Sequence, residues 1–203
     1  MRNIYVVGNS KGYANWMEGT LVSDMKDANL VVFTGGEDVH PSLYGETMNP
    51  TTSANLRRDI IERDEFNKAL ELKKPMVGIC RGSQFLCVMS GGKLIQNQPN
   101  PAYRHEMHTH DGKTLPITST HHQAAYPFVL EEEDYRVLAW GPSLAFHEGG
   151  PGEILHPPYD CEIVRYFKTN ALGIQGHPEA MDHKSETITY LRDKLNKFLN
   201  GTV

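Results

Sequence analysis

One short segment in the middle of the chain limits the possible folds more than any other. The apolar run Pro75–Ile79 leads directly into Gly78-Ile79-Cys80-Arg81-Gly82 and then into the helix-forming stretch Arg81–Ser90. This order predicts a buried strand, a tight turn and a helix, and the two glycines permit the strained turn that holds a nucleophile above a sheet. A short strand that is apolar throughout is typical of a parallel sheet covered on both faces. We therefore expect an α/β fold with Cys80 at the end of one of its strands.

The other predicted elements alternate as such a fold requires. Short apolar runs predict strands, and charged stretches with apolar residues on one face predict helices. Glu37–Asn55 and Gln96–Pro127 are rich in loop-forming residues and are expected to be irregular. We expect a flavodoxin-like three-layer sandwich, with a mainly parallel central sheet and helices on both faces, in a single domain spanning residues 1–203. The predicted strands are Ile4–Gly8, Leu30–Thr34, Tyr135–Trp140, Glu162–Phe167 and Ala171–Gln175, and the predicted helices are Leu56–Leu72, Ser185–Leu199 and, weakly, Leu21–Asn29.

The composition argues against several classes of function. The 203-residue chain has a formal net charge of −5, whereas nucleic-acid binding requires a basic face, so we expect no nucleic-acid partner. No apolar stretch approaches the length that spans a bilayer, and the N-terminal residues read as a strand, so we expect neither a membrane segment nor a signal peptide. Three scattered cysteines are too few for a disulfide framework and indicate a reducing compartment. We expect a cytoplasmic protein.

Cys80 is the candidate nucleophile. The helix that follows it directs its N-terminus toward the sulfur, and Arg81 adds positive charge, so both favour the reactive thiolate. The backbone N–H of Arg81 would lie where an oxyanion develops. The alternative is a buried structural cysteine between a strand and a helix, which is the interpretation that we prefer for Cys87 among its apolar neighbours.

A base and an orienting group for that nucleophile follow another predicted strand. The tetrapeptide Gly176-His177-Pro178-Glu179 places an imidazole and a carboxylate within one turn, and such a pair is what a thiolate nucleophile needs. In parallel sheets, ligands bind beyond the carboxyl ends of the strands, where Gly35-Gly36, Cys80 and His177 all fall. A His-Pro-Glu sequence is weak evidence alone, but together with the elbow around Cys80 it predicts a catalytic triad.

These residues resemble the class I glutamine amidotransferases, and in particular their γ-glutamyl hydrolase branch, peptidase C26. The resemblance extends from Leu30 to about Ala180 and is carried by six blocks in the same order, which is far more specific than any one of them. The blocks are Thr34 through Glu46 (TGGEDVHPSLYGE), Arg58-Asp59-x-x-Glu62, Pro75 through Gly82 with Gln84, Gly91 through Gln96, His121-His122-Gln123, and Gly173 through Glu179.

The resemblance implies a role for each matching residue. Cys80 would attack the γ-carbonyl carbon and form a γ-glutamyl thioester, His177 would move the proton, and Glu179 would orient His177. No cofactor or metal is implied. The expected oxyanion and substrate-binding residues are Gly35 and Gly36, the backbone of Arg81, Gln84 against the glutamyl group, and His121, His122 and Gln123 at the amino-acid end or the pocket wall.

The chain also departs from that family pattern. Relatives in this branch are longer, and this chain is expected to lack a helix–strand unit between Gly8 and Leu30. Gly176 replaces a bulky tryptophan of many relatives, so we expect open space beside His177. Both differences bear on the choice of substrate and leave the expected triad unchanged.

Two groups of polar residues have alternative interpretations. Arg58, Asp59 and Glu62 form either a solvated helical face or a structural ion pair near the site. A cluster of histidines could hold zinc, but it lacks paired cysteines or an H-E-x-x-H helix, so we expect no metal site and prefer a loop that partly faces the substrate. These histidines are His105, His108, His110, His121 and His122.

Three functions are compatible with the sequence. The first is a γ-glutamyl hydrolase that acts alone on glutamine or a γ-glutamyl small molecule. The second is a glutaminase subunit that delivers ammonia to a separate synthetase, which would be its partner protein. The third is a non-catalytic binding protein on the same fold, since a fold alone does not determine a function. The complete set Cys80, His177 and Glu179 argues against the third.

Overall fold

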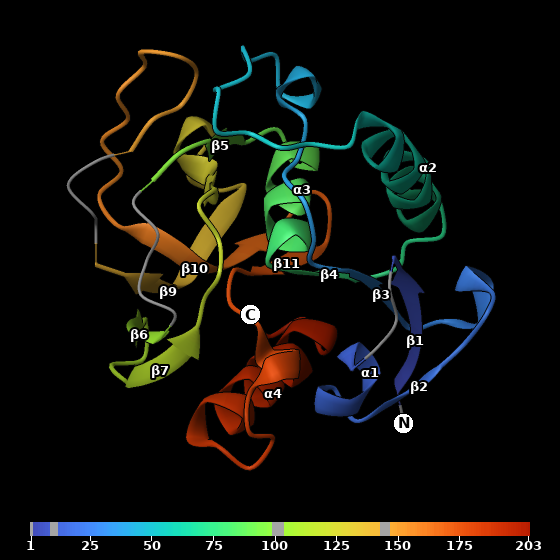
Figure 1. Ribbon diagram of the computed structural model, residues 1–203. Helices are drawn as coiled ribbons and strands as arrows, with labels where there is room; N and C mark the ends of the chain where they lie inside the picture. The colour runs from blue at the N-terminus through green and yellow to red at the C-terminus, as the bar shows by residue number, and fades with distance from the viewer. Residues whose placement is uncertain (1, 9–11, 99–103, 143–146) are drawn as a thin grey trace.

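A sheet of nine strands runs through the centre of the molecule (Figure 1). The computed structural model describes residues 2–8, 12–98, 104–142 and 147–203. The spatial order of the strands is β2-β1-β3-β4-β11-β10-β9-β6-β7. The first five of these run parallel and are β2 (Gly19–Leu21), β1 (Arg2–Val7), β3 (Leu30–Phe33), β4 (Met76–Ile79) and β11 (Ala171–Ile174).

The other half of the sheet is antiparallel. The antiparallel strands continue the nine-stranded sheet beyond β11. A second sheet, of two strands, is separate from the nine-stranded one. The extension consists of β10 (Asp160–Tyr166), β9 (Tyr135–Gly141), β6 (Arg104–Thr109) and β7 (Thr114–Thr118), and the small sheet pairs β5 (Lys93–Ile95) with β8 (Ala124–Tyr126).

Helices cover both faces of the sheet, as Figure 1 shows. On one face α1 (Tyr13–Trp16) and α4 (Glu186–Leu199) contribute to one apolar core, and on the other α2 (Leu56–Glu71) and α3 (Arg81–Met89) contribute to a second. Neighbouring residues of one strand serve opposite cores because side chains alternate along a strand: Val32 lies in the first core and Val31 in the second. The expected three-layer α/β sandwich is therefore confirmed.

Side-chain caps define where the two long helices begin. The Asn55 side chain accepts a hydrogen bond from the backbone N–H of Arg58 at the start of α2, and the Ser185 side chain accepts one from Ile188 at the start of α4. Such caps satisfy N–H groups that have no partner within the helix. The predicted helices over 56–72 and 185–199 are confirmed to within a residue at each end.

Three expectations about the chain between the strands are wrong. The segment Gln96–Pro127 contains the β6–β7 hairpin and β8, and Met107, Leu115 and Ile117 of that hairpin are buried in the core. The helix–strand unit expected to be missing between Gly8 and Leu30 is present in reduced form as α1 and β2. The weak helix predicted over 21–29 is limited to the single 3-10 turn Met25–Asp27. In each case the elements are too short, or too polar on one face, for a periodic pattern to show.

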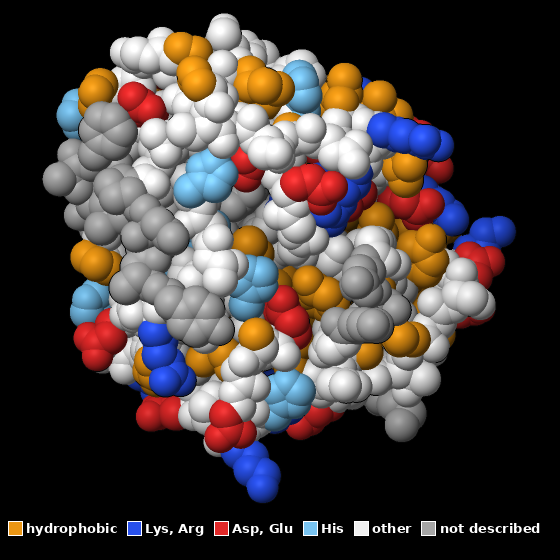
Figure 2. Space-filling model, in the orientation of Figure 1, with side chains coloured by type: hydrophobic (Ala, Val, Ile, Leu, Met, Phe, Trp, Pro, Cys, Tyr) orange, Lys and Arg blue, Asp and Glu red, His pale blue; other side chains and the backbone are white. Residues whose placement is uncertain are grey.

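The surface carries both signs of charge. On the face in Figure 2, Lys and Arg side chains lie among Asp and Glu side chains, in line with the small net charge of −5. Among the described residues, no helix is both long enough and apolar enough to cross a bilayer.

Candidate active site

Cys80 lies at the sharp turn between β4 and α3. Its backbone angles are φ 52° and ψ −111°, a conformation that is costly for a residue with a side chain and is found mainly at functional turns. The turn depends on the flanking glycines: a Cβ atom at Gly78 would lie 2.2 Å from the Gly82 carbonyl oxygen, and one at Gly82 would lie 2.1 Å from the Phe33 carbonyl oxygen. Only residues without a side chain permit this approach of strand and helix.

His177 and Glu179 follow β11, the parallel neighbour of β4. The Nδ1 atom of His177 lies 2.8 Å from Oε1 of Glu179. A Cβ atom built on Gly35 would be 3.3 Å from Cε1 of His177 and 3.7 Å from Cβ of Cys80, so imidazole and thiol lie on the same side of this loop. Adjacent parallel strands thus bring together three residues that are distant in the sequence.

The electrostatic environment favours the imidazolium form of His177. Hydrogen bonds to Cys80 and to Glu179 raise the pKa of His177 to about 10, against the opposing effect of burial. The Nε2 atom also lies 3.0 Å from Oγ1 of Thr120, which the sequence analysis did not include. At neutral pH this histidine therefore holds a proton that it can deliver to a leaving group.

Cys80 and His177 both line a small polar cavity. Its volume is about 310 Å³, within the lower range for small-molecule sites. Four of the expected binding residues line it, whereas Gly35, Gln123 and the side chain of Arg81 do not. The lining residues are Gly36, Asp38, Cys80, Gln84, Thr120, His121, His122 and His177.

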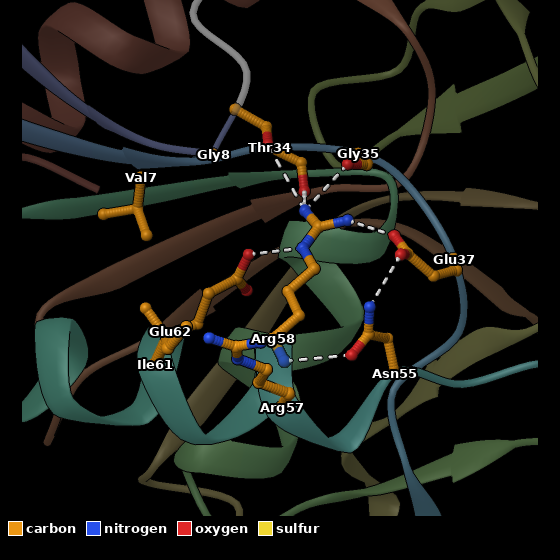
Figure 3. Close-up of a pocket in the computed structure, with 10 residues that line it drawn as sticks. All are labelled: Val7, Gly8, Thr34, Gly35, Glu37, Asn55, Arg57, Arg58, Ile61 and Glu62. Carbon is orange, nitrogen blue, oxygen red and sulfur yellow. Dashed lines mark hydrogen bonds and ion pairs between the residues drawn. The ribbon is translucent and has the colours of Figure 1, made fainter.

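The loop Gly35-Gly36 is held from both sides. The N–H of Gly35 donates to the Tyr13 hydroxyl at 3.1 Å, and Nη2 of Arg58 donates to the Gly35 carbonyl at 2.9 Å (Figure 3). Because a trans peptide points its C=O and N–H in opposite directions, the Gly36 N–H points away from Arg58. Gly36 lines the cavity, so its N–H is available there while that of Gly35 is not.

Gly36 cannot carry a side chain. Its φ is +145°, and a Cβ atom at this position would lie 2.0 Å from Nη1 of Arg58. The guanidinium of Arg58 spreads over the back of the loop and also binds Glu37 at 2.6 Å and Glu62 at 2.7 Å, as Figure 3 shows. The positive φ of Gly36 therefore favours glycine, and the ion-paired guanidinium of Arg58 fills the space that a side chain would need.

Arg81 turns its side chain away from Cys80. The guanidinium forms ion pairs with Asp59 and Glu62 of α2, and all three side chains are buried. The expectation that Arg81 adds its charge to the thiolate is therefore corrected, because two carboxylates neutralise that charge. As the first residue of α3, Arg81 still has a backbone N–H without an intrahelical partner.

The Arg-Asp-x-x-Glu block is thus structural. Arg58 forms an ion pair with Glu62 one helical turn further on, but the sequence did not indicate that Asp59 and Glu62 would both bind Arg81. Asp59 also accepts a hydrogen bond from the His40 N–H at 3.0 Å. The first two turns of α2 therefore hold both the Gly35-Gly36 loop and the start of α3.

Gln84 anchors the inner wall of the cavity. Its Nε2 donates to the Gln123 carbonyl at 2.7 Å, and the Gln123 side chain donates to Oγ1 of Thr52 at 3.0 Å. His122 lies 3.0 Å from Oδ2 of Asp38, and its hydrogen bond to Asp38 raises its pKa. Asp38 and His122 therefore form a hydrogen-bonded carboxylate–imidazole pair in the lining of the cavity.

The histidine cluster is dispersed in the structure. Among the described residues no group of three or more His, Cys, Asp or Glu side chains could hold a metal ion. His121 is buried, which lowers its pKa to about 4 and keeps it neutral. The histidines have different neighbours: Glu162 for His105, Thr114 for His108, Lys194 for His110, Ser119 for His121 and Asp38 for His122.

Gly176 does not open space beside His177. A Cβ atom at this position would lie 2.3 Å from Cγ1 of Ile117 and 2.9 Å from the Thr118 carbonyl oxygen. The expected opening is therefore wrong, because the β7 strand of the unforeseen hairpin fills the place. His177 is also tied to this hairpin, since its N–H donates to the Thr118 carbonyl at 3.0 Å.

The other two cysteines lie in the core. Cys87 is fully buried, and burial raises its pKa to about 12. Burial also raises the pKa of Cys161 well above its ordinary value. Thiols of this kind stay protonated and unreactive at neutral pH. The interpretation of Cys87 as a packing residue fits this environment.

Three residues at the site were missed by sequence reasoning. Tyr13 follows a glycine in a segment without a strong pattern, and no signal pointed to it. Thr120 directly precedes the His121-His122-Gln123 block, and Asp38 lies within the block around Gly35-Gly36, so both were close to residues already named.

Comparison with known proteins supplies a family. A family model described as peptidase C26 matches residues 18–137, a range that includes Cys80 and ends before His177. Protein NtpR of Enterococcus hirae is 30% identical over 176 residues, which are 80% of this chain and 72% of that protein. Gamma-glutamyl-gamma-aminobutyrate hydrolase PuuD of Escherichia coli is 26% identical over 160 residues, covering 70% of this chain and 60% of that protein. The crystal structure of a glutamine amidotransferase from Thermotoga maritima aligns over 97% of this chain and 84% of that chain, with a TM-score of 0.58 and 14% identity, so it shares the fold.

Proposed function

This chain belongs to the peptidase C26 family of glutamine amidotransferase-like proteins, and we propose that it hydrolyses the γ-amide of glutamine or of a γ-glutamyl compound through a cysteine thioester. The observation that carries the proposal is the position of Cys80 at a strained strand–helix turn beside His177. The Nδ1 atom of this histidine lies 2.8 Å from the Glu179 carboxylate. This arrangement of nucleophile, base and orienting group is the one that acyl transfer requires.

The first half of the reaction forms the thioester. The Cys80 sulfur attacks the γ-carbonyl carbon while His177 holds the thiol proton, and the carbonyl π electrons move onto oxygen. The N–H groups of Gly36 and Arg81 stabilise that oxyanion, since neither is used within its own loop or helix. When the oxyanion collapses, the C–N bond breaks, and His177 gives its proton to the departing ammonia or amine.

The second half returns the enzyme to its starting state. His177, now neutral, takes a proton from water, and the resulting hydroxide attacks the thioester carbon. The C–S bond breaks, glutamate leaves, and the sulfur departs as a thiolate beside the protonated His177, which restores the starting pair. Glu179 keeps the imidazole oriented in both halves through its contact with Nδ1. The remaining cavity residues, Gln84 and His122 among them, would contact the glutamyl part of the substrate.

A diazoketone analogue of glutamine tests the proposal, because it alkylates a nucleophile only in a pocket that accepts the glutamyl group. Intact-mass and peptide mass spectrometry should show one adduct, located on Cys80, and ammonia release from glutamine by the purified chain should be lost in Cys80→Ala. The matched control is Cys87→Ala, which removes a buried thiol about two helical turns further along α3 and should retain both adduct and turnover.

The outcomes separate the alternatives. An adduct on Cys87 or Cys161, or full turnover by Cys80→Ala, contradicts the mechanism. An adduct on Cys80 without turnover of glutamine or γ-glutamyl amines by the purified chain would instead favour a glutaminase subunit that requires a synthetase partner. Absence of both adduct and turnover would favour a non-catalytic role.

A further inference from the structure

Tyr13 is a buried residue whose hydroxyl lies at the back of the proposed active site. It begins α1 and is 8% exposed. Its hydroxyl oxygen accepts a hydrogen bond from the Gly35 N–H at 3.1 Å. A Cβ atom on Gly35 would be 3.3 Å from this oxygen and 3.3 Å from Cε1 of His177, so hydroxyl and imidazole lie around the same glycine. The mechanism above uses neither α1 nor this hydroxyl.

The Glu179 carboxylate is a candidate acceptor for the proton of that hydroxyl. Oε1 of Glu179 is engaged by His177, whereas Oε2 is buried and, among the described residues, has no hydrogen bond of ordinary geometry. The start of α1 packs against this residue, since a Cβ atom on Gly12 would lie 3.7 Å from Cβ of Glu179. An acceptor that is buried without a donor is costly, which favours a hydrogen bond from Tyr13 to this oxygen.

The protonation state of Tyr13 agrees with a donor role. Burial and then the charge of Glu179 raise the pKa of Tyr13 to about 12, with a smaller contribution from Cys80. These two residues are the charged or titratable groups that act on the phenol. The hydroxyl therefore keeps its proton throughout the range in which the enzyme would work.

We propose that Tyr13 is a positioning residue that accepts the Gly35 N–H and donates to Oε2 of Glu179, and so couples the oxyanion loop to the carboxylate that orients His177. The inference rests on the hydrolase function proposed above. Tyr13 does not touch the substrate. Its first contact is with the N–H of Gly35, the residue before the proposed oxyanion donor Gly36. Its second contact is with Glu179, the side chain that orients the imidazole of His177.

Two consequences follow from this double contact. The first concerns geometry: Gly35 is held by Tyr13 at its N–H and by Arg58 at its carbonyl, so the loss of either contact frees the loop to rotate. The second concerns electrostatics, because a hydrogen bond donated to a carboxylate withdraws negative charge from it. Without that donor, Glu179 would stabilise the imidazolium more strongly, and the pKa of His177 would rise.

Tyr13→Phe tests the proposal, because it removes one oxygen atom and leaves the aromatic ring. We expect kcat to fall by about 10- to 100-fold, the value of a hydrogen bond to a charged group, with KM changed by less than about 3-fold. The alkaline limb of the pH profile, and the imidazole titration of His177 followed by NMR, should move to higher pH by about half a unit or more. In a Glu179→Gln background the same substitution should cost less than about 3-fold, because the two residues act as a unit.

The matched control is Tyr190→Phe. Tyr190 is similarly buried, at 5% exposed, and its hydroxyl donates to the Asp111 carboxylate at 3.2 Å; neither residue lines the cavity. This variant loses the same kind of hydrogen bond and should retain both kcat and the titration of His177. If Tyr190→Phe moves the titration as much as Tyr13→Phe does, the effect reflects general loosening and the proposal is wrong.

The NMR titration keeps this inference separate from the proposed function. It needs no turnover, so it reports on Tyr13 even if the chain alone does not hydrolyse glutamine. An unchanged His177 titration in folded Tyr13→Phe overturns the role of Tyr13 whatever the activity. A shifted titration in a protein without adduct or turnover supports the contact and contradicts the hydrolase function instead. If Tyr13→Phe does not fold, fluorotyrosine at this position, which makes the phenol more acidic, should shift the same titration, and no shift overturns the proposal.

Discussion

Replacement of Arg81 by Met would leave two buried carboxylates without their shared cation. In the native protein Arg81, Asp59 and Glu62 are 1%, 0% and 2% exposed, so water cannot solvate the charges that remain. Removal of one member of a buried ion pair typically costs about 3–5 kcal/mol. Here Glu62 keeps Arg58 at 2.7 Å and Asp59 keeps the His40 N–H at 3.0 Å, so we expect the lower end, about 3 kcal/mol.

That cost is large relative to the stability of a domain, which is roughly 5–15 kcal/mol. It corresponds to a decrease in Tm of roughly 6–12 °C for a chain of this size. Urea denaturation followed by circular dichroism should show the lower free energy of unfolding with an unchanged dependence on urea. Because acid protonates the uncompensated carboxylates, the difference between Arg81→Met and the native protein should shrink as the pH falls.

The matched control is Arg63→Met, an exposed arginine of the same helix α2 as the two acids. Its substitution should change the free energy of unfolding by less than about 0.5 kcal/mol. If Arg81→Met also costs less than about 1 kcal/mol with a normal urea dependence, the three charges are not a buried network. The argument that α2 holds the start of α3 would then fail.

Three further substitutions test the environment of the site. Glu179→Gln should move the alkaline limb of kcat/KM to lower pH. Hydrogen bonds to Cys80 and to this carboxylate raise the pKa of His177 to about 10, and activity is expected to be lost as the pH rises through that value. His121→Asn should flatten the pH dependence of stability between about 6.5 and 4. The pKa of His121 in the folded state is about 4, below the ordinary 6.5, so the unfolded chain binds the proton more readily. The native protein therefore loses about 3 kcal/mol of stability as the pH falls through that interval. An unchanged pH dependence of the free energy of unfolding, measured by urea titration of the variant, would contradict this. Gly176→Ala should cost about 1–3 kcal/mol by overpacking against Ile117, and thermal melts should show part of that loss recovered in the double variant with Ile117→Ala.

The proposed site is assembled by contacts that converge on α2 and the β6–β7 hairpin. From one side, Arg58 holds the oxyanion loop while Asp59 and Glu62 hold Arg81. From the other, the carbonyl of Thr118 in the hairpin accepts the His177 N–H. The proposed nucleophile, base and oxyanion loop are therefore each supported by residues of α2 or the hairpin that do not line the cavity.

The amino-acid sequence by itself determined the fold class and the family, and it predicted the turn on which the proposed nucleophile lies. A run such as Pro75–Ile79 and the glycines around Cys80 constrain the chain locally, since apolar periodicity and the absence of a Cβ act over a few residues. The rule that ligands bind at the carboxyl ends of parallel strands then placed Cys80 near His177, and in the structure their strands are adjacent.

Only the tertiary structure decided which side chains are partners. Arg81 binds Asp59 and Glu62 and not the thiol, Ile117 fills the place beside Gly176, and Tyr13 reaches the oxyanion loop from a four-residue helix. None of these contacts has a local signature, because each joins residues that are brought together by the packing of separate elements. A sequence pattern reports what a segment does with its neighbours along the chain. The partner of a buried charge or hydroxyl depends on which distant segment comes within about 3 Å of it.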